Sequence, residues 1–312
     1  MENFLLALSV IFPIFVNLAL GYVMMRFKIL DDNSVKKINA SVFKVFLPLL
    51  LFYNIYSTNI ESALKPKLML FAVLSIVILF FVLLFVIPLI EKDNKKVGPI
   101  IQGIFRSNFV IFGIPVATLL CTADDIGATS LLVAVVVPLF NVLAVFVMEF
   151  FRGEKVNFKN VLKGVITNPL IIASILGLVF AFLNIKMPSI LVKSISDVAK
   201  IATPLALIAL GASFTFKSVK GYIKQIIIGV LGKLVIVPFI LLSVAVMLGF
   251  RNGDLVSLMV LYASPAAVSS FVMAQQMDAD ALLAGHFVVL GSIFSIFTVF
   301  MWILILKTLM LI

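Results

Sequence analysis

Charged residues are scarce in this chain: Asp, Glu, Lys and Arg make up only 12% of its 312 residues. A soluble globular protein has about 25% charged and about 45–50% apolar residues, whereas 63% of this sequence is hydrophobic. At about 20 residues per bilayer-spanning helix, that is enough apolar sequence for about ten spans. The composition excludes a soluble enzyme and predicts an all-α integral membrane protein.

Reactive residues are equally few. The single cysteine, Cys121, excludes an intrachain disulfide and leaves the redox compartment open. No HExxH, GxSxG, P-loop or Cys/His cluster occurs, which argues against an intramembrane hydrolase or an ATP-driven pump. Because no Asp or Glu lies in the middle of an apolar run, a carboxylate proton relay or sodium cage has no obvious residues. We therefore expect neither a metal nor a cofactor.

Apolar runs predict ten transmembrane helices. They cover residues 3–25, 38–57, 67–90, 98–121, 127–149, 160–183, 194–213, 222–248, 253–277 and 280–306. No connection is longer than about 15 residues, so we expect no soluble domain. The first run follows Met1-Glu2-Asn3 without a basic segment and is too long for a signal peptide, so it is expected to be a permanent span.

Basic residues mark one side of the membrane. Alternate loops carry 14 Lys and Arg on one face and 6 on the other. By the positive-inside rule the richer face is cytoplasmic and both termini lie outside. The net charge of +10 thus indicates cytoplasmic loops rather than a nucleic-acid partner. The basic residues inside the predicted spans are Lys44, Arg106, Lys200 and Lys233.

The chain repeats itself. A spacing of 156 residues relates Pro13 to Pro169, Gly21 to Gly177, Lys44 to Lys200 and Pro48 to Pro204; a spacing of 150 relates Pro88 to Pro238, Gly103 to Gly253, Ser107 to Ser257 and Pro115 to Pro265. These matches predict one five-helix repeat over residues 1–150 and a second over residues 151–312. Because five is odd, the second repeat is inverted, which is typical of secondary transporters.

Spans four and nine each carry a proline near the middle, Pro115 and Pro265. Such a proline deprives the carbonyls near Ile111 and Leu261 of their helical partner. In hydrocarbon that loss costs several kcal/mol, unless the break lines a cavity or another group donates. The polar groups available are Ser107, Asn108, Ser264, Ser269 and Ser270. Two broken helices would aim positive half-helix ends at one point and favour an anion; the alternative is a pair of kinks that only serve packing.

Several polar residues inside the spans have two interpretations. Lys233, near the midplane, is either functional or a structural cation held by carbonyls. Arg106 either attracts an anion or extends its guanidinium to the surface, and we expect Lys44 and Lys200 to extend to the surface. Three further polar residues inside the spans are Asn17, Asn141 and His286. The two amides either line the site or bond neighbouring helices; the histidine is expected to be structural rather than a proton relay.

Several of these stretches resemble the auxin efflux carrier family. They are Pro13…Gly21-Tyr22…Arg26…Asp31 with Phe46-Leu47-Pro48, then Asn168-Pro169-Leu170-Ile171-Ile172…Gly177, the run from Ala202-Thr203-Pro204 to Gly211-Ala212-Ser213, and Asn108…Gly113-Ile114-Pro115 with Pro265…Ala274. The resemblance covers nearly the whole chain. Since no long loop joins spans five and six, the chain is similar to the compact bacterial branch of the family.

The resemblance implies a carrier of organic anions or weak carboxylic acids, such as auxins in plants and malate or malonate in bacteria. It implies a scaffold of helices 1, 2, 6 and 7 that forms a homodimer, and a transport domain of helices 3–5 and 8–10 with broken crossover helices 4 and 9. Asn108, Gly113, Pro115 and Pro265 then belong to the crossovers. The expected location is the bacterial inner membrane.

We therefore predict an exporter or uniporter of small organic anions that works by an elevator-like movement. Asn108 and Ser264 would contact the carboxylate, helped by Ser269, Asn141, Arg106 and Lys233. An interior-negative potential favours anion exit by about 2.3 kcal/mol per charge per 100 mV without a coupling ion. One alternative is a sodium- or proton-coupled symporter of the bile-acid type, for which Gln275, Gln276 and Ser269 are the clustered oxygens. Another is a membrane sensor that binds without transport.

Overall fold

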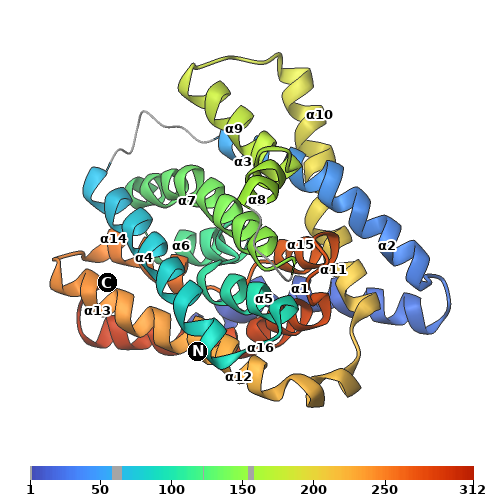
Figure 1. Cartoon of the computed structure of the whole chain (residues 1–312). Helices are drawn as coiled ribbons and strands as arrows, with labels where there is room; N and C mark the ends of the chain where they lie inside the picture. Colours follow the sequence, from blue (N-terminus) through green and yellow to red (C-terminus); the bar gives the residue numbers. More distant parts are fainter. Residues whose placement is uncertain (1, 58–64, 122, 154–157) are drawn as a thin grey trace.

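The computed structural model describes residues 2–57, 65–121, 123–153 and 158–312, and the regular secondary-structure elements of these residues are all helices (Figure 1). Extended pairing within the described residues is limited to one isolated bridge between Ser107 and Ala266. This confirms the prediction of an all-α chain.

Helices of the first half follow the predicted apolar runs. They are α1 (Glu2–Arg26), α2 (Asp32–Ser41), η1 (Val42–Phe46), α3 (Leu47–Tyr56), α4 (Pro66–Ile90), α5 (Asn94–Phe105), η2 (Phe109–Gly113), α6 (Ile114–Leu120) and α7 (Ala123–Phe150). Asp31 and Asp93 begin α2 and α5 by accepting backbone N–H groups of the first turn, as capping residues do.

Helices of the second half are interrupted more often. They are α8 (Phe158–Ile166), α9 (Pro169–Phe182), α10 (Ser189–Ala199), α11 (Ala202–Ser213), η3 (Phe216–Tyr222), α12 (Ile223–Leu231), η4 (Gly232–Ile236), α13 (Val237–Met247), α14 (Asn252–Ala263), α15 (Ser269–Gln276) and α16 (Ala281–Thr308). The capping pattern recurs, since Asn168 precedes α9 with Pro169 in its first turn and Asp280 caps α16.

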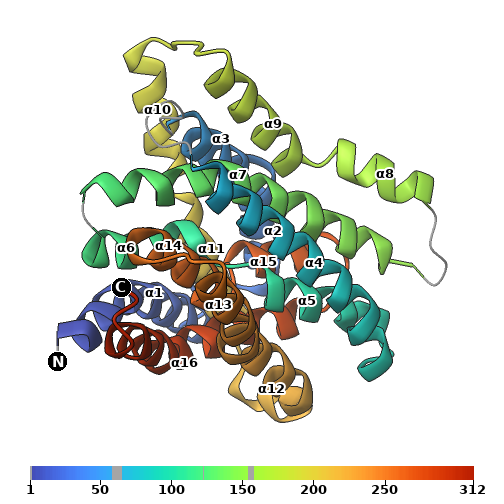
Figure 2. The same ribbon diagram turned by 90° about the vertical axis from the view of Figure 1, so that its left-hand side faces the viewer.

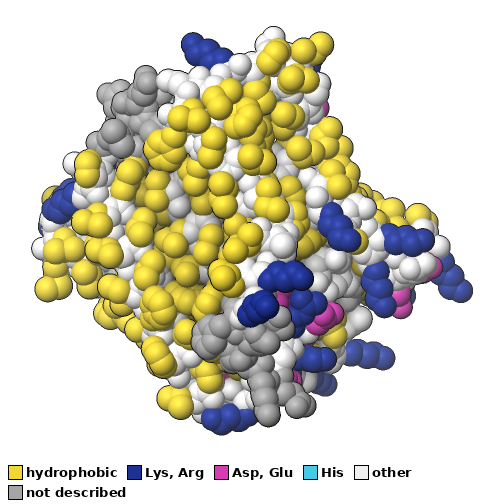
Figure 3. All heavy atoms as spheres, turned by 45° about the horizontal axis from the view of Figure 1, so that its top comes forward, with side chains coloured by type: hydrophobic (Ala, Val, Ile, Leu, Met, Phe, Trp, Pro, Cys, Tyr) yellow, Lys and Arg dark blue, Asp and Glu magenta, His cyan; other side chains and the backbone are white. Residues whose placement is uncertain are grey.

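Among the described residues, six helical stretches are long and apolar enough to span a bilayer. They are Asp32–Tyr56, Pro66–Ile90, Leu132–Phe150, Ser189–Ser213, Lys217–Met247 and Ala281–Thr308, with shorter apolar helices at Phe12–Arg26, Phe109–Leu120 and Pro169–Phe182. Apolar side chains also cover the outside of the molecule: Leu89 is 74% exposed and Phe85 72%. Figure 3 shows a broad hydrophobic surface with basic and acidic side chains gathered at its lower right border. The chain is a multi-pass membrane protein.

Helices α1 and α11 touch backbone to backbone. A Cβ on Gly21 would lie 1.9 Å from the carbonyl oxygen of Ile208, and one on Gly211 would lie 2.0 Å from that of Leu18. Only glycine allows this approach, because any side chain would overlap the opposite carbonyl. These two glycines therefore fix the contact between α1 and α11.

Helices α3 and α9 make a similar but looser contact. A Cβ on Gly177 would lie 3.0 Å from Cβ of Ile55 and 3.2 Å from the carbonyl oxygen of Phe52. With α10, these helices form a group at the top of Figures 1 and 2.

Prolines distort three of the long helices into π-helical turns. The turns are η1, η2 and η4, and the prolines that follow them are Pro48, Pro115 and Pro238. A proline cannot donate to the carbonyl four residues earlier, and a π turn is a common way to absorb the resulting distortion. For Pro238 that carbonyl belongs to Leu234, and it accepts a hydrogen bond of 2.9 Å from the indole Nε1 of Trp302.

Connections between helices meet on two opposite sides. On one side Lys65 pairs with Asp254 at 2.7 Å, and the Asn252 N–H donates to Leu311 O at 2.8 Å. On the other, Arg152 pairs with Asp278 at 2.6 Å. Both ends of the chain lie at the left of Figure 2, and α8 lies at the right. The two ends therefore lie on the same side of the molecule.

Candidate functional site

Two interrupted helices meet inside the molecule. The first interruption separates α5 from η2 and the second separates α14 from α15. Their extended segments pair as antiparallel strands: Ser107 bridges Ala266, and the Asn108 N–H donates to the Pro265 carbonyl at 2.8 Å. Ser107 and Asn108 are both buried. The contact satisfies part of the backbone that the interruptions free, as a buried non-helical segment requires.

The carbonyl freed by Pro265 has a side-chain donor. The hydroxyl of Ser107 donates to Leu261 O, four residues before the proline. The ammonium of Lys233, itself 3% exposed, donates to the same Ser107 hydroxyl. Loss of the helical partner at Leu261 is thus confirmed, and a chain of donors runs from Lys233 through Ser107 to the break.

Pro115 does not lie at the interruption of its own helix, whereas Pro265 does. The first interruption comes at Arg106–Asn108, seven to nine residues earlier, and Pro115 sits in the first turn of α6 after a π turn. The two prolines related by the 150-residue spacing therefore do not face each other at the contact. The polar pair Ser107 and Asn108 marks the first interruption.

Arg106 does not extend to the surface. Its side chain is 4% exposed, Nη2 donates to Oδ1 of Asn141 at 2.7 Å, and Nη1 donates to Sδ of Met273 at 2.6 Å. Within the described chain the ion pairs lie outside this region, at partly or fully exposed residues. Arg106 and Lys233 are thus two buried basic groups held by neutral partners, an arrangement that attracts an anion.

A cavity of about 70 Å³ adjoins the contact. Its lining comes from Leu47, Leu50, Leu51, Asn54, Arg106, Ser107, Asn108, Phe109, Val110, Ile111, Val137, Phe140, Thr203, Ala206, Ala267, Val268 and Ser269. The amide Nδ2 of Asn108 is buried without a hydrogen-bond partner among the described groups. Since a buried unpaired donor is costly, this amide is a candidate to donate to a ligand in the cavity.

The cavity includes some predicted site residues and not others. Arg106, Asn108 and Ser269 line it, whereas Gly113, Pro115, Pro265, Lys233 and Asn141 do not. Ser264 was expected to contact a carboxylate, but its hydroxyl donates to Val260 O within its own helix and it is not a lining residue. A serine at a helix can bond back to the carbonyl four residues earlier, and sequence spacing alone does not reveal which serines do so.

Two lining residues were missed by the sequence interpretation: Asn54 of α3 and Thr203 of α11. Both are isolated polar residues in apolar runs, the same signal that drew attention to Asn141. Asn17, which carries that signal too, donates to Pro13 O in its own helix at 2.8 Å. The pattern finds intramembrane polar residues but does not distinguish those that face a cavity.

His286 lies away from the cavity. Its Nε2 is 3.0 Å from the Ser218 hydroxyl, and its ring contacts those of Phe214 and Tyr222. Lys44 and Lys200 are exposed, and Lys200 pairs with Asp197 at 3.3 Å. The surface position expected for both lysines agrees with the structure.

The three oxygens considered for sodium do not converge. Gln275 accepts from the buried amide of Asn39, while Gln276 lines a separate polar cavity of about 590 Å³ with Arg152 and Lys163. Ser269 lines the central cavity instead. In the described residues no group of three or more His, Cys, Asp or Glu forms a metal site.

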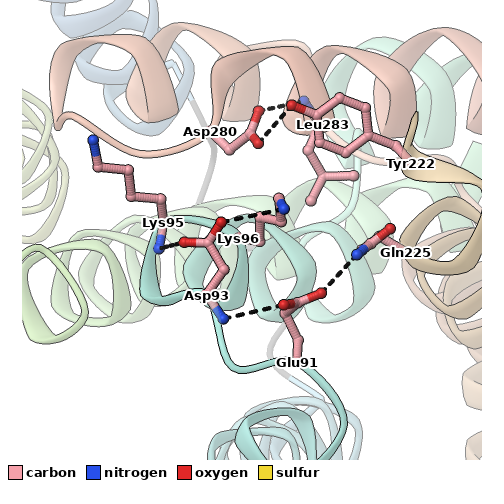
Figure 4. A network of polar contacts seen from close by, with 8 residues as sticks. All are labelled: Glu91, Asp93, Lys95, Lys96, Tyr222, Gln225, Asp280 and Leu283. Carbon is pink, nitrogen blue, oxygen red and sulfur yellow. Dashed lines mark hydrogen bonds and ion pairs between the residues drawn. The ribbon is translucent and has the colours of Figure 1, made fainter. Parts of the chain in front are cut away.

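A polar network joins the helix ends on the Arg152 side (Figure 4). Burial acts to raise the pKa of Glu91, but the Gln225 amide at 2.7 Å and the Asp93 N–H at 3.1 Å outweigh it and lower this pKa. The neighbouring Asp93 carboxylate raises the pKa of Lys96. This network ties the α4–α5 connection to α12, and the Tyr222 hydroxyl donates to Asp280 at 2.9 Å.

Comparison with known proteins identifies the family. Residues 6–303 match the model of the family described as "Membrane transport protein". The chain belongs to this family. The match confirms the resemblance to auxin efflux carriers and makes the chain a membrane transporter rather than an enzyme.

Two relatives extend over nearly the full length. An "Uncharacterized transporter" of Methanocaldococcus jannaschii is 22% identical over 307 residues, covering 96% of this chain and 98% of the relative. A Rhizobium meliloti protein with the name "Putative malonate transporter" is 26% identical over 304 residues, covering 93% of each chain. Both relatives are named as transporters.

Proposed function

We propose that this protein is a secondary transporter of small organic anions and that the anion binds between the two interrupted helices. The observation that carries the proposal is the pair of buried basic groups, Arg106 and Lys233, beside a break in each helix. The free amide of Asn108 supplies a further donor. Helix N-termini at Phe109 and Ser269 add positive partial charge at the same point.

The substrate class we infer is a small carboxylate, such as a dicarboxylate of the malonate type. A cavity of about 70 Å³ suits a compact anion, and one relative's name refers to malonate. A carboxylate matches the geometry of guanidinium and amide donors. Asn108 would donate to the carboxylate, Arg106 would attract it from the cavity wall, and Ser269 and Thr203 are further hydroxyls on the lining.

The architecture we infer is two inverted five-helix repeats in ten spans, with α5–α6 and α14–α15 as crossover helices. The glycine contacts support it: Gly21 approaches the carbonyl of Ile208, and Gly177 approaches that of Phe52. Gly177 lies 156 residues after Gly21, and Ile208 lies 156 residues after Phe52. This offset is the spacing of the sequence repeat. Two-fold related repeats predict this exchange of partners.

The movement we infer is an elevator-like shift of the helices around the contact against a scaffold of α1, α3, α9 and α11 with their extensions. The scaffold would also form a homodimer. The richer basic face would be cytoplasmic, both termini would lie outside, and the location would be the inner membrane. Lys233 places a buried basic group at the break, which supports anion transport without a coupling sodium ion.

Current measurements on proteoliposomes adsorbed to a solid-supported membrane test this function. We expect rapid jumps of malonate or malate to give a protein-dependent current of the same size with and without sodium. Jumps of citrate, short monocarboxylates and indole acetate define the selectivity. Strict sodium dependence would favour the symporter alternative, and saturable binding without current or flux would favour a sensor.

A further inference from the structure

An apolar groove of about 680 Å³ runs along α4 opposite α12 and α13, on the outside of the molecule. Ile104 and Gly232 are among its lining residues, and a Cβ on Gly232 would lie 3.2 Å from Ile104. Lining side chains such as Ile78, 61% exposed, and Ile240, 52% exposed, face outward. From Phe71 to Ile90 the groove follows α4 for about 28 Å, close to the thickness of a bilayer core.

Two lysines stand at one end of this groove. Lys224 Nζ donates to Ile90 O at 3.0 Å, and Lys92 Nζ donates to Pro88 O at 2.8 Å; Ile90 is itself a lining residue. Each ammonium has three donors, so two remain on each for another acceptor. The nearby carboxylate of Glu91 accepts from the Gln225 amide.

We propose that the half of the groove next to Lys92 and Lys224 holds an acyl chain of an anionic phospholipid, with the phosphate on the two ammonium groups. The apolar walls match the chain through packing contacts, since the surrounding lipid is equally apolar. The exposed lysines match the phosphate charge. Gly232 lines this half and precedes Lys233, so the bound chain lies directly behind the lysine that donates to Ser107.

Native mass spectrometry of the detergent-purified protein tests this site. Phosphatidylglycerol and phosphatidylcholine with identical chains are the probes. Each lysine near an anionic lipid strengthens binding about fivefold, so we expect wild type to prefer phosphatidylglycerol roughly 25-fold. In K92Q/K224Q the preference should disappear while weak binding of both lipids persists. In Val82→Trp, which fills the groove at a half-exposed lining residue, both lipids should be lost.

A matched control is K36Q/K37Q, which removes two exposed lysines of α2 and should bind as wild type does. Val86→Trp, a second filling substitution, guards against misfolding of the first; each variant must elute as one symmetric peak. Equal preference in K92Q/K224Q and wild type would overturn the headgroup assignment. Unchanged binding in both tryptophan variants would overturn the groove. If wild type is a dimer and both tryptophan variants are monomers, the groove binds a second copy of the chain, and the lipid proposal is overturned.

Discussion

The α1–α11 contact and the contact between the interrupted helices are opposite solutions to packing in a membrane. At Gly21 and Gly211 two complete helices approach until their backbones touch, and no space remains. At Ser107 and Ala266 the helices are interrupted; the Ser107 hydroxyl replaces one missing hydrogen bond, and a cavity adjoins the contact. Stability and binding therefore depend on different helix pairs. The α1–α11 pair is fixed by close backbone contact, whereas the interrupted pair keeps a buried hydrogen-bond donor that the described protein groups do not use.

The largest effect is expected from breaking the first contact. Gly211→Ala places a methyl 2.0 Å from the Leu18 carbonyl oxygen, so the helices must separate and packing along both is lost. We expect destabilisation on the order of 4 kcal/mol or more and loss of the monodisperse peak in size-exclusion chromatography. Gly221→Ala is the control, because a Cβ at Gly221 has no neighbour within 4 Å. Normal elution of Gly211→Ala would refute the role given to this contact.

Asn108→Ala breaks the second region without crowding it. The variant removes a buried amide whose Nδ2 has no partner among the described groups, so the fold should be retained. A hydrogen bond to a charged ligand contributes about 1.5–3 kcal/mol, so flux should fall about 10- to 100-fold. Initial rates in proteoliposomes, with elution volume and thermal midpoint as controls, measure both effects. Unchanged kinetics would place the binding site elsewhere.

Lys233→Met sharpens the comparison, because stability and transport should change in opposite directions. A buried ammonium paired only with a hydroxyl costs desolvation energy, which a hydrophobic side chain of similar length removes. We therefore expect a higher thermal midpoint together with reduced anion flux. If the midpoint falls instead, Lys233 serves the fold through its bond to Ser107 and not the substrate.

Trp302→Phe tests a third arrangement, in which a side chain donates to the carbonyl that a proline leaves without a backbone donor. The indole is the donor to Leu234 O, and its loss leaves that carbonyl unsatisfied at a cost of about 1–3 kcal/mol. In a Pro238→Ala background the restored backbone N–H can donate instead, so the same substitution should cost less. Equal costs in both backgrounds, from thermal unfolding, would mean that the bond does not compensate for the proline.

The smallest effect is expected at the helix ends. Since the folded-state pKa of Glu91 is lowered by Gln225 and the Asp93 N–H despite burial, ionised Glu91 stabilises the fold above its unfolded pKa. That stabilisation is lost as pH falls through the folded-state value. Gln225→Ala should therefore lower the thermal midpoint at pH 7, and the difference should fade on acidification. A pH-independent difference would exclude the Glu91 contact as its cause.

The sequence predicted more of the helices than of the site. Apolar runs, prolines and caps located most helical segments, and Pro265 correctly indicated the freed carbonyl of Leu261. The position of the first interruption was missed, because Pro115 is absorbed in a π turn while the chain extends at Ser107 and Asn108. Residue types along the chain indicate where a helix can lose a hydrogen bond, but the segment packed against it determines where the helix is interrupted.

Side-chain direction was the other missing information. Arg106 could extend to the surface or turn inward, and only the position of Asn141 on α7, 2.7 Å away, decides for the interior. Ser264 and Ser269 are equally plausible by type, yet one bonds its own helix and the other lines the cavity. Such choices depend on contacts between residues far apart in sequence, which spacing along one chain does not contain.

The indole that bonds Leu234 belongs to the one tryptophan of the chain. The ultraviolet emission of the unlabelled protein therefore reports on a single place, one residue along the backbone from Lys233. A ligand that rearranges the donors at Ser107 changes the field and hydrogen bonding felt by that fluorophore. The molecule thus carries its own optical sensor, which allows equilibrium titrations and stopped-flow kinetics without a dye or an engineered reporter.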